Sequence, residues 1–544
     1  MASLNPMSGV LGKRLAAHLL RRTTFGPSRA DIDAFANKTV NQAINELLDP
    51  VGYAHPTEPR DPKSGQGTTW VYGQASTHHV TLRDYLAGWF FDEAFDNKLP
   101  HIAQRITFFL STIFVSRIET ARPENMYHQL RLLRHYSNGS IKAIARKICM
   151  DNAMIKFLDS QTSKAGSPNE NFPRELLELF TIGKGPQIAP NNYTTYTEYD
   201  VQTAAKIFTG IKQENDWRNN GKRDPDTNIP RGRIQLNQHD TSTKVFSAAF
   251  GNRQITGGNN LNDIYREFDE FYDMVFNKIE TAQNYVRKIY RFFVHSNITP
   301  EIEKDIIFPL ATDLYNSNYN ITVVMDRLLR SEHFYDADDA QSDDEIIGAF
   351  IKSPIELLLS SMKLFNLTPP LEARDAYEHY HRFWRQTVVK FYMPETDMGL
   401  LNPPSVAGYN AYHQAPAYSR AWVSPNTLPI RYKLADMLLE NDKLLVRGDF
   451  YVELDVMDFV DNYISDPRDP LKLVQEIIDY AFPEAVPQAR FDYFLNDLLL
   501  GNLSMINWGF EWDYYLNSGN DRNVRPQLEK LVRGVLQAPE FQLF

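Results

Sequence analysis

The sequence contains one cysteine, Cys149, among its 544 residues. A single thiol excludes an intrachain disulfide and any zinc site that is built from several cysteines. Cys149 lies in the stretch 141–158, where apolar residues recur at helical spacing. We therefore expect it to be a small buried side chain rather than a reactive group.

Long hydrophobic runs are also missing. No stretch reaches the roughly 18 to 20 apolar residues of a transmembrane helix, so no membrane span is expected. The first residues lack the charged-then-apolar order of a signal peptide, and basic residues such as Lys13, Arg14 and Arg21 interrupt the first apolar segment. These features predict a cytoplasmic protein, and export without a cleaved leader is the alternative.

Dense runs of basic residues are absent, and the formal net charge is -11. Because binding to nucleic-acid phosphates requires a basic surface, we expect no nucleic-acid partner. The sequence also lacks the nucleophile elbow Gly-x-Ser-x-Gly, the Walker phosphate loop, the dinucleotide-binding Gly-x-Gly-x-x-Gly and the zinc-protease His-Glu-x-x-His. The commonest hydrolase, nucleotide-binding and zinc-protease interpretations are thereby removed.

The sequence does contain helical periodicity over most of its length. A hydrophobic content of 43% with 23% charged residues is typical of a folded globular chain. Apolar residues at helical spacing recur in many segments, for example 141–158, 264–295 and 346–365. We predict an all-α fold, a large single multi-helix assembly over residues 1–544 with long ordered loops and one small β hairpin.

Three stretches interrupt the helical pattern. Residues 55–73 are rich in Pro, Gly and Thr and predict a long loop. Residues 212–258 predict a loop and hairpin insertion, since the segment 233–237 alternates as a short strand does. Residues 393–429 predict an irregular crossing segment. Long loops within compact domains are often functional, so these are the places where a protein partner would bind. The oligomeric state is left open.

The most distinctive local pattern runs from Asn169 to Gly183. Pro173 suits the first turn of a helix, and Gly183 suits the position just after its end. On a helical wheel the apolar residues of this stretch form one arc, and Arg174, Glu175 and Glu178 fall on the opposite arc. Two carboxylates and one guanidinium therefore share one surface of the predicted helix.

This pattern has two interpretations. In the functional one, Glu170, Glu175 and Glu178 present oxygens to a hard cation or polarise a water molecule, and Arg174 holds an anionic group or orients a carboxylate. In the structural one, the charges are the solvated face of an ordinary amphipathic helix. The clean separation of the arcs favours structure. The crowded polar residues 169–171 favour function, because capping needs only one of them.

A second candidate is the pair His239-Asp240, which comes after the predicted strand. In a loop both side chains can converge on a metal or a substrate. The commoner arrangement, which we favour, is a turn in which Asp240 caps a backbone N–H while His239 is solvated. Similarly, His18 and Arg22 share one side of the first helix and suit an anion, but solvated basic residues are the commoner outcome there.

Two further segments favour structural interpretations. Ser353, Pro354 and Glu356 have the spacing of a helix start with a capping box. The aromatic run 402–418, which includes Tyr412 and His413, suits a binding lip, although packing of these rings onto the helices is the simpler expectation.

Eight segments follow one another in a recognisable order: 18–27, 159–183, 196–210, 239–244, 292–295, 352–356, 403–408 and 538–541. Together they resemble the bacterial family known as domain of unknown function 1800. The resemblance implies a helical fold and no established reaction, and members of that family are often exported. Members often carry a Trp-His-Asn-His-like cluster where this chain has Phe108 to Phe114, which contains no histidine.

The sequence supports two hypotheses about function. The first is a non-catalytic binding or assembly protein, in which the polar Asn-Glu-Asn and Arg-Glu motif locks the helices. The alternative is a metal-assisted hydrolase that brings six residues into one pocket: Glu170, Arg174, Glu175, Glu178, His239 and Asp240. Neither the cofactor nor the metal can be inferred from the sequence.

Overall fold

The structure is a computed structural model. It describes residues 2–61, 69–72, 77–95, 100–214, 221–338, 345–369, 381–439, 452, 454–501 and 503–544. Parts of the predicted 55–73 loop (62–68 and 73) and of the predicted 212–258 insertion (215–220) lie outside the described residues.

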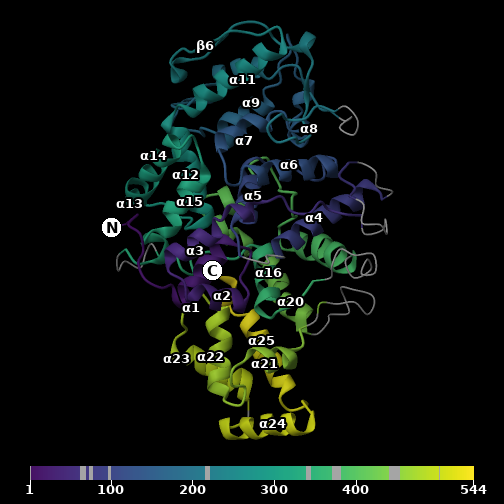
Figure 1. Cartoon of the computed structure of the whole chain (residues 1–544), viewed down its shortest axis with the longest axis vertical. Coiled ribbons are helices and arrows are strands. Elements are labelled where there is room, and N and C mark those ends of the chain that lie inside the picture. Colours follow the sequence, from purple (N-terminus) through teal and green to yellow (C-terminus); the bar gives the residue numbers. More distant parts are fainter. Residues whose placement is uncertain are drawn as a thin grey trace.

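The molecule is elongated, and its helices form three tiers along the long axis (Figure 1). The chain begins in the middle tier with α1 (Gly12–Thr23), α2 (Arg29–Ala36), α3 (Val40–Leu47), α4 (His79–Phe95), α5 (Ala103–Ile113) and α6 (Pro123–His135). It then builds the upper tier from α7 (Ile141–Ile148), α8 (Asn152–Phe157), α9 (Asn171–Glu175), α10 (Glu198–Ile207) and α11 (Leu261–Phe276).

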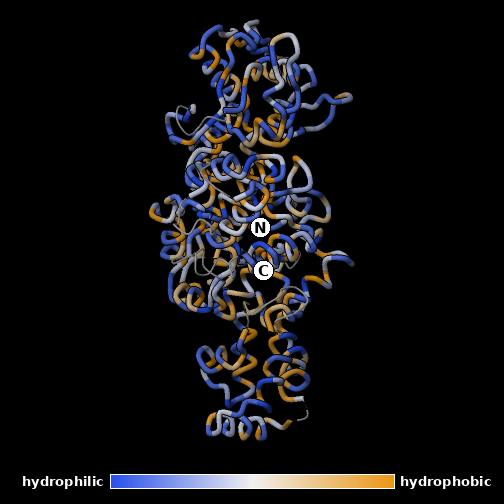
Figure 2. The backbone as a smooth tube through the Cα atoms, turned by 90° about the vertical axis from the view of Figure 1, so that its right-hand side faces the viewer, coloured by the Kyte–Doolittle hydropathy of each residue, from blue (hydrophilic) through white to orange (hydrophobic). Residues whose placement is uncertain are grey.

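The chain returns to the middle tier and ends by building the lower one. The second pass contains α12 (Ile279–Phe293), α13 (Pro300–Ile302), α14 (Phe308–Asn316), α15 (Ile321–Arg330), α16 (Pro354–Leu364), α18 (Met393–Glu395), α19 (Asn410–His413) and α20 (Thr427–Leu439). The lower tier consists of α21 (Val456–Tyr463), α22 (Pro470–Ala481), α23 (Gln488–Asp492), α24 (Met505–Ser518) and α25 (Arg525–Leu536). Hydrophobic segments run through all three tiers (Figure 2).

Helices of other types are interspersed. The π-helices are η3 (Leu176–Phe180), η6 (Glu303–Ile307), η9 (His381–Tyr392) and η11 (Tyr493–Leu500). The 3-10 helices are η1 (Pro50–Tyr53), η2 (Ser160–Thr162), η4 (Leu236–Gln238), η5 (Ala248–Phe250), η7 (His333–Tyr335), η10 (Tyr418–Trp422) and η12 (Pro539–Gln542). Among the described residues, no helix is both long enough and apolar enough to cross a membrane.

The prediction of an all-α fold is confirmed, and strands are confined to small antiparallel pairs. In the described residues these are β1 (Gln187–Ala189) with β2 (Asn192–Tyr193), β3 (Ile211–Lys212) with β4 (Arg233–Ile234), and β5 (Lys244–Val245) with β6 (Gln254–Ile255). The region where one hairpin was predicted thus contributes to two of these pairs. Whether residues 1–544 form one domain stays a prediction.

Local signals in the sequence explain several helix starts. The side chain of Ser28 accepts a hydrogen bond from the N–H of Asp31, whose carboxylate accepts one from the N–H of Ser28 at 2.8 Å. At α16 the carboxylate of Glu356 accepts a hydrogen bond from the N–H of Ser353 at 2.6 Å. Cys149 is buried, as expected.

The expectation that the basic residues of the first helix are solvated is wrong. His18, Arg21 and Arg22 of α1 are buried. Arg21 donates to the carbonyl oxygens of Tyr480 (2.7 Å) and Phe482 (3.2 Å). These carbonyls end α22, so the buried guanidinium satisfies acceptors that the helix itself leaves without partners.

Arg21 and Arg22 belong to a group of buried cations that we call the cationic core: Arg21, Arg22, Arg105, Lys352 and Arg431. The guanidinium of Arg22 lies 4.4 Å and 4.7 Å from the ring centres of Phe350 and Phe544. Lys352 donates to the carbonyl oxygen of Phe541 at 2.6 Å. Helix α1 and residues 541–544 therefore pack against the same group of buried cations.

Candidate functional site

The motif around Asn169 forms a helix with a change of pitch. It runs as an α-helix from Asn171 to Glu175 and as the π-helix η3 from Leu176 to Phe180. We call these ten residues the motif helix. The hydroxyl of Thr181 donates to the carbonyl oxygen of Leu176 at 2.6 Å. Short π-helical segments widen a helix and occur frequently at functional sites.

The predicted division of the motif helix into two faces is confirmed for most positions. Phe172, Leu176, Leu177 and Phe180 are buried, whereas Leu179 is only partly buried. The motif helix ends at Phe180. Gly183 follows it with a φ of +75° and donates its N–H to the carbonyl of Leu177 at 2.9 Å, as a left-handed terminating residue does.

Arg174 ties the motif helix to α10. Its guanidinium donates to both carboxylate oxygens of Glu198, at 2.6 Å and 2.8 Å, and to Glu170 at 2.9 Å. The Arg174 guanidinium holds the pKa of Glu198 below its usual range. A bidentate pair of this kind fixes orientation as well as adding energy, although partial exposure limits its strength. Arg174 thus links two helices.

The crowded polar residues at the start of the motif helix also have structural partners. The side-chain amide of Asn169 donates to the carbonyl of Asp159 (3.2 Å) and to the hydroxyl of Thr162 (3.1 Å). The side-chain carbonyl of Asn169 accepts from the backbone N–H of Asn171. The side-chain amide of Asn171 donates to the carbonyl oxygen of Leu158 at 3.3 Å. These bonds tie the start of the helix to residues 158–163.

Glu175 differs from its neighbours. Its side chain makes no hydrogen bond or ion pair with a described residue. Burial and then the nearby Glu178 raise the pKa of Glu175 to about 7. A carboxylic acid that titrates near neutrality is suited to proton transfer, although purely structural surroundings can produce the same shift.

The raised pKa of Glu175 predicts a pH-dependent cost to stability. The folded protein holds this proton more tightly than the unfolded chain does, so stability falls as pH rises between about 4.5 and 7. Because the side chain is partly exposed, we expect Glu175→Gln to stabilise the protein by only about 1 kcal/mol at pH 8 and not at pH 5. Urea denaturation of the parent and of Glu175→Gln at pH 5 and pH 8 measures their free energies of unfolding.

Glu170→Gln is the matched control, because the Glu170 carboxylate has an ionic partner in Arg174. It should lower stability slightly at pH 8. If Glu175→Gln and Glu170→Gln change the free energy of unfolding equally at pH 8, ionisation of Glu175 does not destabilise the folded protein.

Glu178 reaches a pocket at the boundary of the upper and middle tiers. Its carboxylate forms an ion pair with Lys184. The pocket has a volume of about 250 Å³ and is lined by α5, the motif helix, α12, residues 406–407 and α19: Phe109, Thr112, Ile113, Glu178, Leu179, Lys288, Phe292, Val406, Ala407, Tyr412 and His413. We call it the Lys288 pocket.

Lys288 is the cation of this pocket. Its ammonium group donates to the carbonyl oxygen of Leu179 on the motif helix. Burial, followed by the nearby Arg291, lowers the pKa of Lys288 to about 8. Burial and Lys288 also lower the pKa of His413, so that its ring is neutral at pH 7. Among the described residues, no carboxylate lies within ion-pairing distance of Lys288.

Aromatic rings form part of the wall of the pocket. The ring centres of Phe292 and Tyr412 lie 5.1 Å apart, and those of Phe109 and Phe292 also lie 5.1 Å apart. Tyr412 therefore packs onto the helices, as was favoured for the 402–418 run, and at the same time lines a cavity. Sequence reasoning did not find Lys288, because a lysine at an ordinary helical position gives no signal until the tertiary structure surrounds it.

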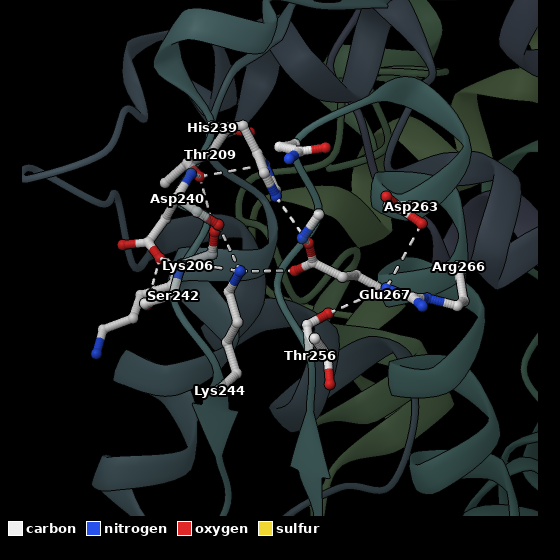
Figure 3. A network of polar contacts seen from close by, with 12 residues as sticks. Lys206, Thr209, His239, Asp240, Ser242, Lys244, Thr256, Asp263, Arg266 and Glu267 are labelled. Carbon is white, nitrogen blue, oxygen red and sulfur yellow. Dashed lines mark hydrogen bonds and ion pairs between the residues drawn. The ribbon is translucent and has the colours of Figure 1, made fainter.

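His239 and Asp240 belong to a different network (Figure 3). His239 and Lys244 both approach the carboxylate of Glu267 on α11, at 3.1 Å and 2.6 Å, and all three side chains are fully buried. The other ring nitrogen of His239 lies 3.0 Å from the carbonyl oxygen of Thr209. Both ring nitrogens of His239 therefore have oxygen partners inside the protein.

The expectation of a solvated His239 is wrong, whereas the turn predicted for Asp240 is confirmed. The Asp240 carboxylate accepts from the N–H of Ser242 at 2.9 Å. His239 is excluded from water because Glu267, buried with it, supplies a partner for its ring. Glu267 lies 28 residues further along the chain, so no local pattern indicated the pair.

The structure thus places the six predicted residues in separate groups. Glu170 pairs with Arg174, which joins α10, and Glu178 lines the Lys288 pocket with Glu175 near it. His239 and Asp240 lie with Lys244 and Glu267. Among the described residues, no hydrogen bond or ion pair joins His239, Lys244 or Glu267 to the motif helix. Within the described part of the chain, no three His, Cys, Asp or Glu side chains are grouped so as to hold a metal ion. The catalytic roles stay predictions.

Comparison with known proteins gives one result. The family model described as Protein of unknown function (DUF1800) matches residues 18–543. This match covers nearly the whole chain, and the protein belongs to that family. No curated protein and no solved structure shows a significant match.

Proposed function

We propose that the protein is a non-catalytic binding protein, and that its ligand is a small organic acid held in the Lys288 pocket. The observation that carries this proposal is the uncompensated charge of Lys288 in a cavity with aromatic walls. Glu178 is already neutralised by Lys184, and the His413 ring is neutral. The pocket therefore carries one positive charge that no described carboxylate balances.

The motif helix has a supporting role in this proposal. Three side chains of α12 bind carbonyl oxygens at its end: Asn284 binds Thr181 at 2.6 Å, Tyr285 binds Phe180, and Lys288 binds Leu179. Arg174 binds α10 on the opposite side. The polar motif thus locks the helices, and the lock fixes Glu178 and Lys288 at the pocket.

The volume of the pocket limits the ligand. Pockets that take drug-sized molecules occupy roughly 300 to 1,000 Å³, so a cavity of about 250 Å³ suits a smaller molecule. Phe109, Phe292 and Tyr412 offer apolar contact to a ring or a short chain. We therefore infer a monocarboxylate with a small aromatic or aliphatic body.

Isothermal titration of the purified protein with benzoate, phenylacetate and hexanoate tests this proposal. Lys288→Met keeps the length of the side chain and removes its charge, and should weaken binding at pH 7 by about a hundredfold. Lys304→Met, at an exposed lysine of η6, should leave binding unchanged. If no acid of the series binds, or if both variants bind as the parent does, the proposal fails.

The pH dependence of binding has a definite sign. A bound carboxylate raises the pKa of Lys288 from about 8, so only the protonated amine binds well. We expect a nearly constant affinity between pH 6 and 7 and a decline of about tenfold per pH unit above pH 8. Titrations at pH 6, 7, 8 and 9 measure it, and an affinity that rises above pH 8 would contradict the assignment of Lys288.

A metal-assisted hydrolase is the second candidate. It is favoured by one observation, the pKa of about 7 of Glu175 next to Glu178. Of the six residues predicted for this function, Glu170, Arg174, Glu175 and Glu178 lie together on or beside the motif helix and would carry it, whereas His239 and Asp240 lie in the separate Glu267 network. Hydrolysis of small esters with added Mg²⁺, Mn²⁺ or Zn²⁺ that is lost in a folded Glu175→Gln variant would support it over simple binding.

A further inference from the structure

The amine of Lys288 lies in surroundings that suit a chemical role in addition to its charge. Its side chain lines a cavity of about 250 Å³ together with Phe109, Phe292 and Tyr412. Its amine donates to the carbonyl oxygen of Leu179, and among the described residues it has no carboxylate partner. A lysine that is desolvated beside apolar side chains, without a carboxylate to hold its proton, is the kind that attacks carbonyl carbons.

The hydrogen bond to Leu179 orients the amine. When Lys288 loses its proton, one N–H still donates to this carbonyl oxygen, because a lone pair that faced the oxygen would be repelled. The Nζ lone pair therefore points away from Leu179 and is available to form a bond. Burial lowers the pKa of Lys288 to about 8, so about a tenth of its amine is neutral at pH 7, against roughly 1 in 2,500 for an ordinary lysine.

The charged groups around the pocket leave the amine of Lys288 without a counter-charge. Arg291 on the same helix disfavours its protonated form, and Glu178 is paired with Lys184. His413 of α19 lines the same pocket, and partial burial followed by Lys288 keeps its ring neutral at pH 7 by lowering its pKa. The pocket therefore holds an amine nucleophile and a neutral base.

We propose that Lys288 captures small aldehydes as an imine, with His413 as the proton carrier. The Nζ lone pair forms the C–N bond while the π pair of the aldehyde C=O moves to oxygen. The His413 ring carries the two amine protons in turn to this oxygen, which leaves as water when the C–O bond breaks and the C=N bond forms. Addition of water in the reverse order releases the aldehyde, so the step balances without an oxidant or a reductant.

Imine formation goes beyond the binding of acids, although it uses the same pocket. Benzaldehyde and hexanal have the same small bodies as benzoate and hexanoate, so Phe109, Phe292 and Tyr412 should contact them in the same way. A carboxylate binds the protonated amine, whereas a carbonyl carbon is attacked by the neutral amine. One lysine therefore gives the pocket two classes of ligand, acids and aldehydes.

Reductive trapping of the full chain tests this inference. The protein is incubated with benzaldehyde and cyanoborohydride at pH 7, and peptide mapping by mass spectrometry measures the benzyl adduct at each lysine. Lys288 should be modified at least about tenfold faster than Lys304, whose side chain is 77% exposed. This preference should shrink above pH 8, where the Lys288 amine is already neutral. Modification of Lys288 that is no faster than that of Lys304 overturns the proposal.

A variant of His413 tests the proton carrier. Because His413 is exposed, His413→Gln should fold as the parent does, and it should slow the formation of the adduct at Lys288 by at least about tenfold. Lys304→Met is the matched control and should leave that adduct unchanged. An adduct that forms equally fast in His413→Gln overturns the role of His413.

Titration of the parent with benzoate separates imine formation from the binding of acids. If benzoate binds and Lys288 gives no preferred adduct, imine formation is overturned and the proposed binding of acids stands. If Lys288 gives the adduct and benzoate does not bind, imine formation stands and the proposed binding of acids is overturned.

Discussion

Replacing Glu356 by leucine should destabilise the protein by about 3 to 5 kcal/mol. Glu356 lies beside the cationic core. Its carboxylate forms an ion pair with Arg105, and both side chains are almost completely buried. The carboxylate also offsets the burial of Arg22, whose pKa is lowered to about 9 because burial outweighs this attraction. Without Glu356, several buried cations would lose a common counter-charge.

A double variant tests whether this loss of stability comes from leaving buried cations without a counter-charge. Arg105→Met with Glu356→Leu removes both members of the ion pair, and we expect it to be more stable than Glu356→Leu alone. Glu119→Gln serves as the exposed control, because its pair with Arg117 should contribute well under 1 kcal/mol. Urea denaturation at pH 7 measures all three. Equal losses in the single and double variants would assign the effect to packing instead of charge.

The second large effect is expected at Glu267. This carboxylate accepts from His239, from Lys244 and from the N–H of Gly258, all inside the protein. Glu267→Gln keeps the volume but removes the charge that balances Lys244, and should cost about 3 to 5 kcal/mol. Adding Lys244→Met should recover part of that loss. A Glu267→Gln variant within about 1 kcal/mol of the parent would show that the network contributes little to folding.

The effect at Glu267 also separates the two hypotheses about His239. If the pair His239-Asp240 serves structure, Glu267→Gln lowers stability while a folded sample retains full ligand binding at the Lys288 pocket. If the pair serves catalysis, the same folded sample loses turnover. Measuring both properties below the unfolding transition distinguishes these results.

Some parts of the site were predictable from sequence because their causes are local. The two faces of the motif helix arise from the spacing of Phe172, Leu176 and Leu177, and its end is set by Gly183. The capping pairs at Ser28 and Ser353 involve residues three positions apart. Short-range hydrogen bonds and helical periodicity are properties that one segment carries by itself.

Other parts were not predictable because their causes are distant in sequence. The Lys288 pocket joins Phe109, Glu178, Lys288 and Tyr412. Arg21 and Arg22 of α1 gave the pattern of a solvated face, yet their acceptors are the carbonyls of Tyr480, Phe482 and Ile346. The π-helix η3 was also not predicted, because a change of pitch over five residues barely alters the spacing of apolar residues.

The joining of the first helix to the last residues has a consequence during synthesis. Arg22 packs on Phe544, and Lys352 binds the carbonyl of Phe541, so these contacts wait until residues 541–544 have left the ribosome. At about 5 to 20 residues per second, the residues between Arg22 and Phe544 take on the order of a minute to make. Until then, the arginines of α1 that are buried in the folded protein lack part of their native contacts. These contacts of the middle tier therefore form only after the residues of the upper and lower tiers have been made.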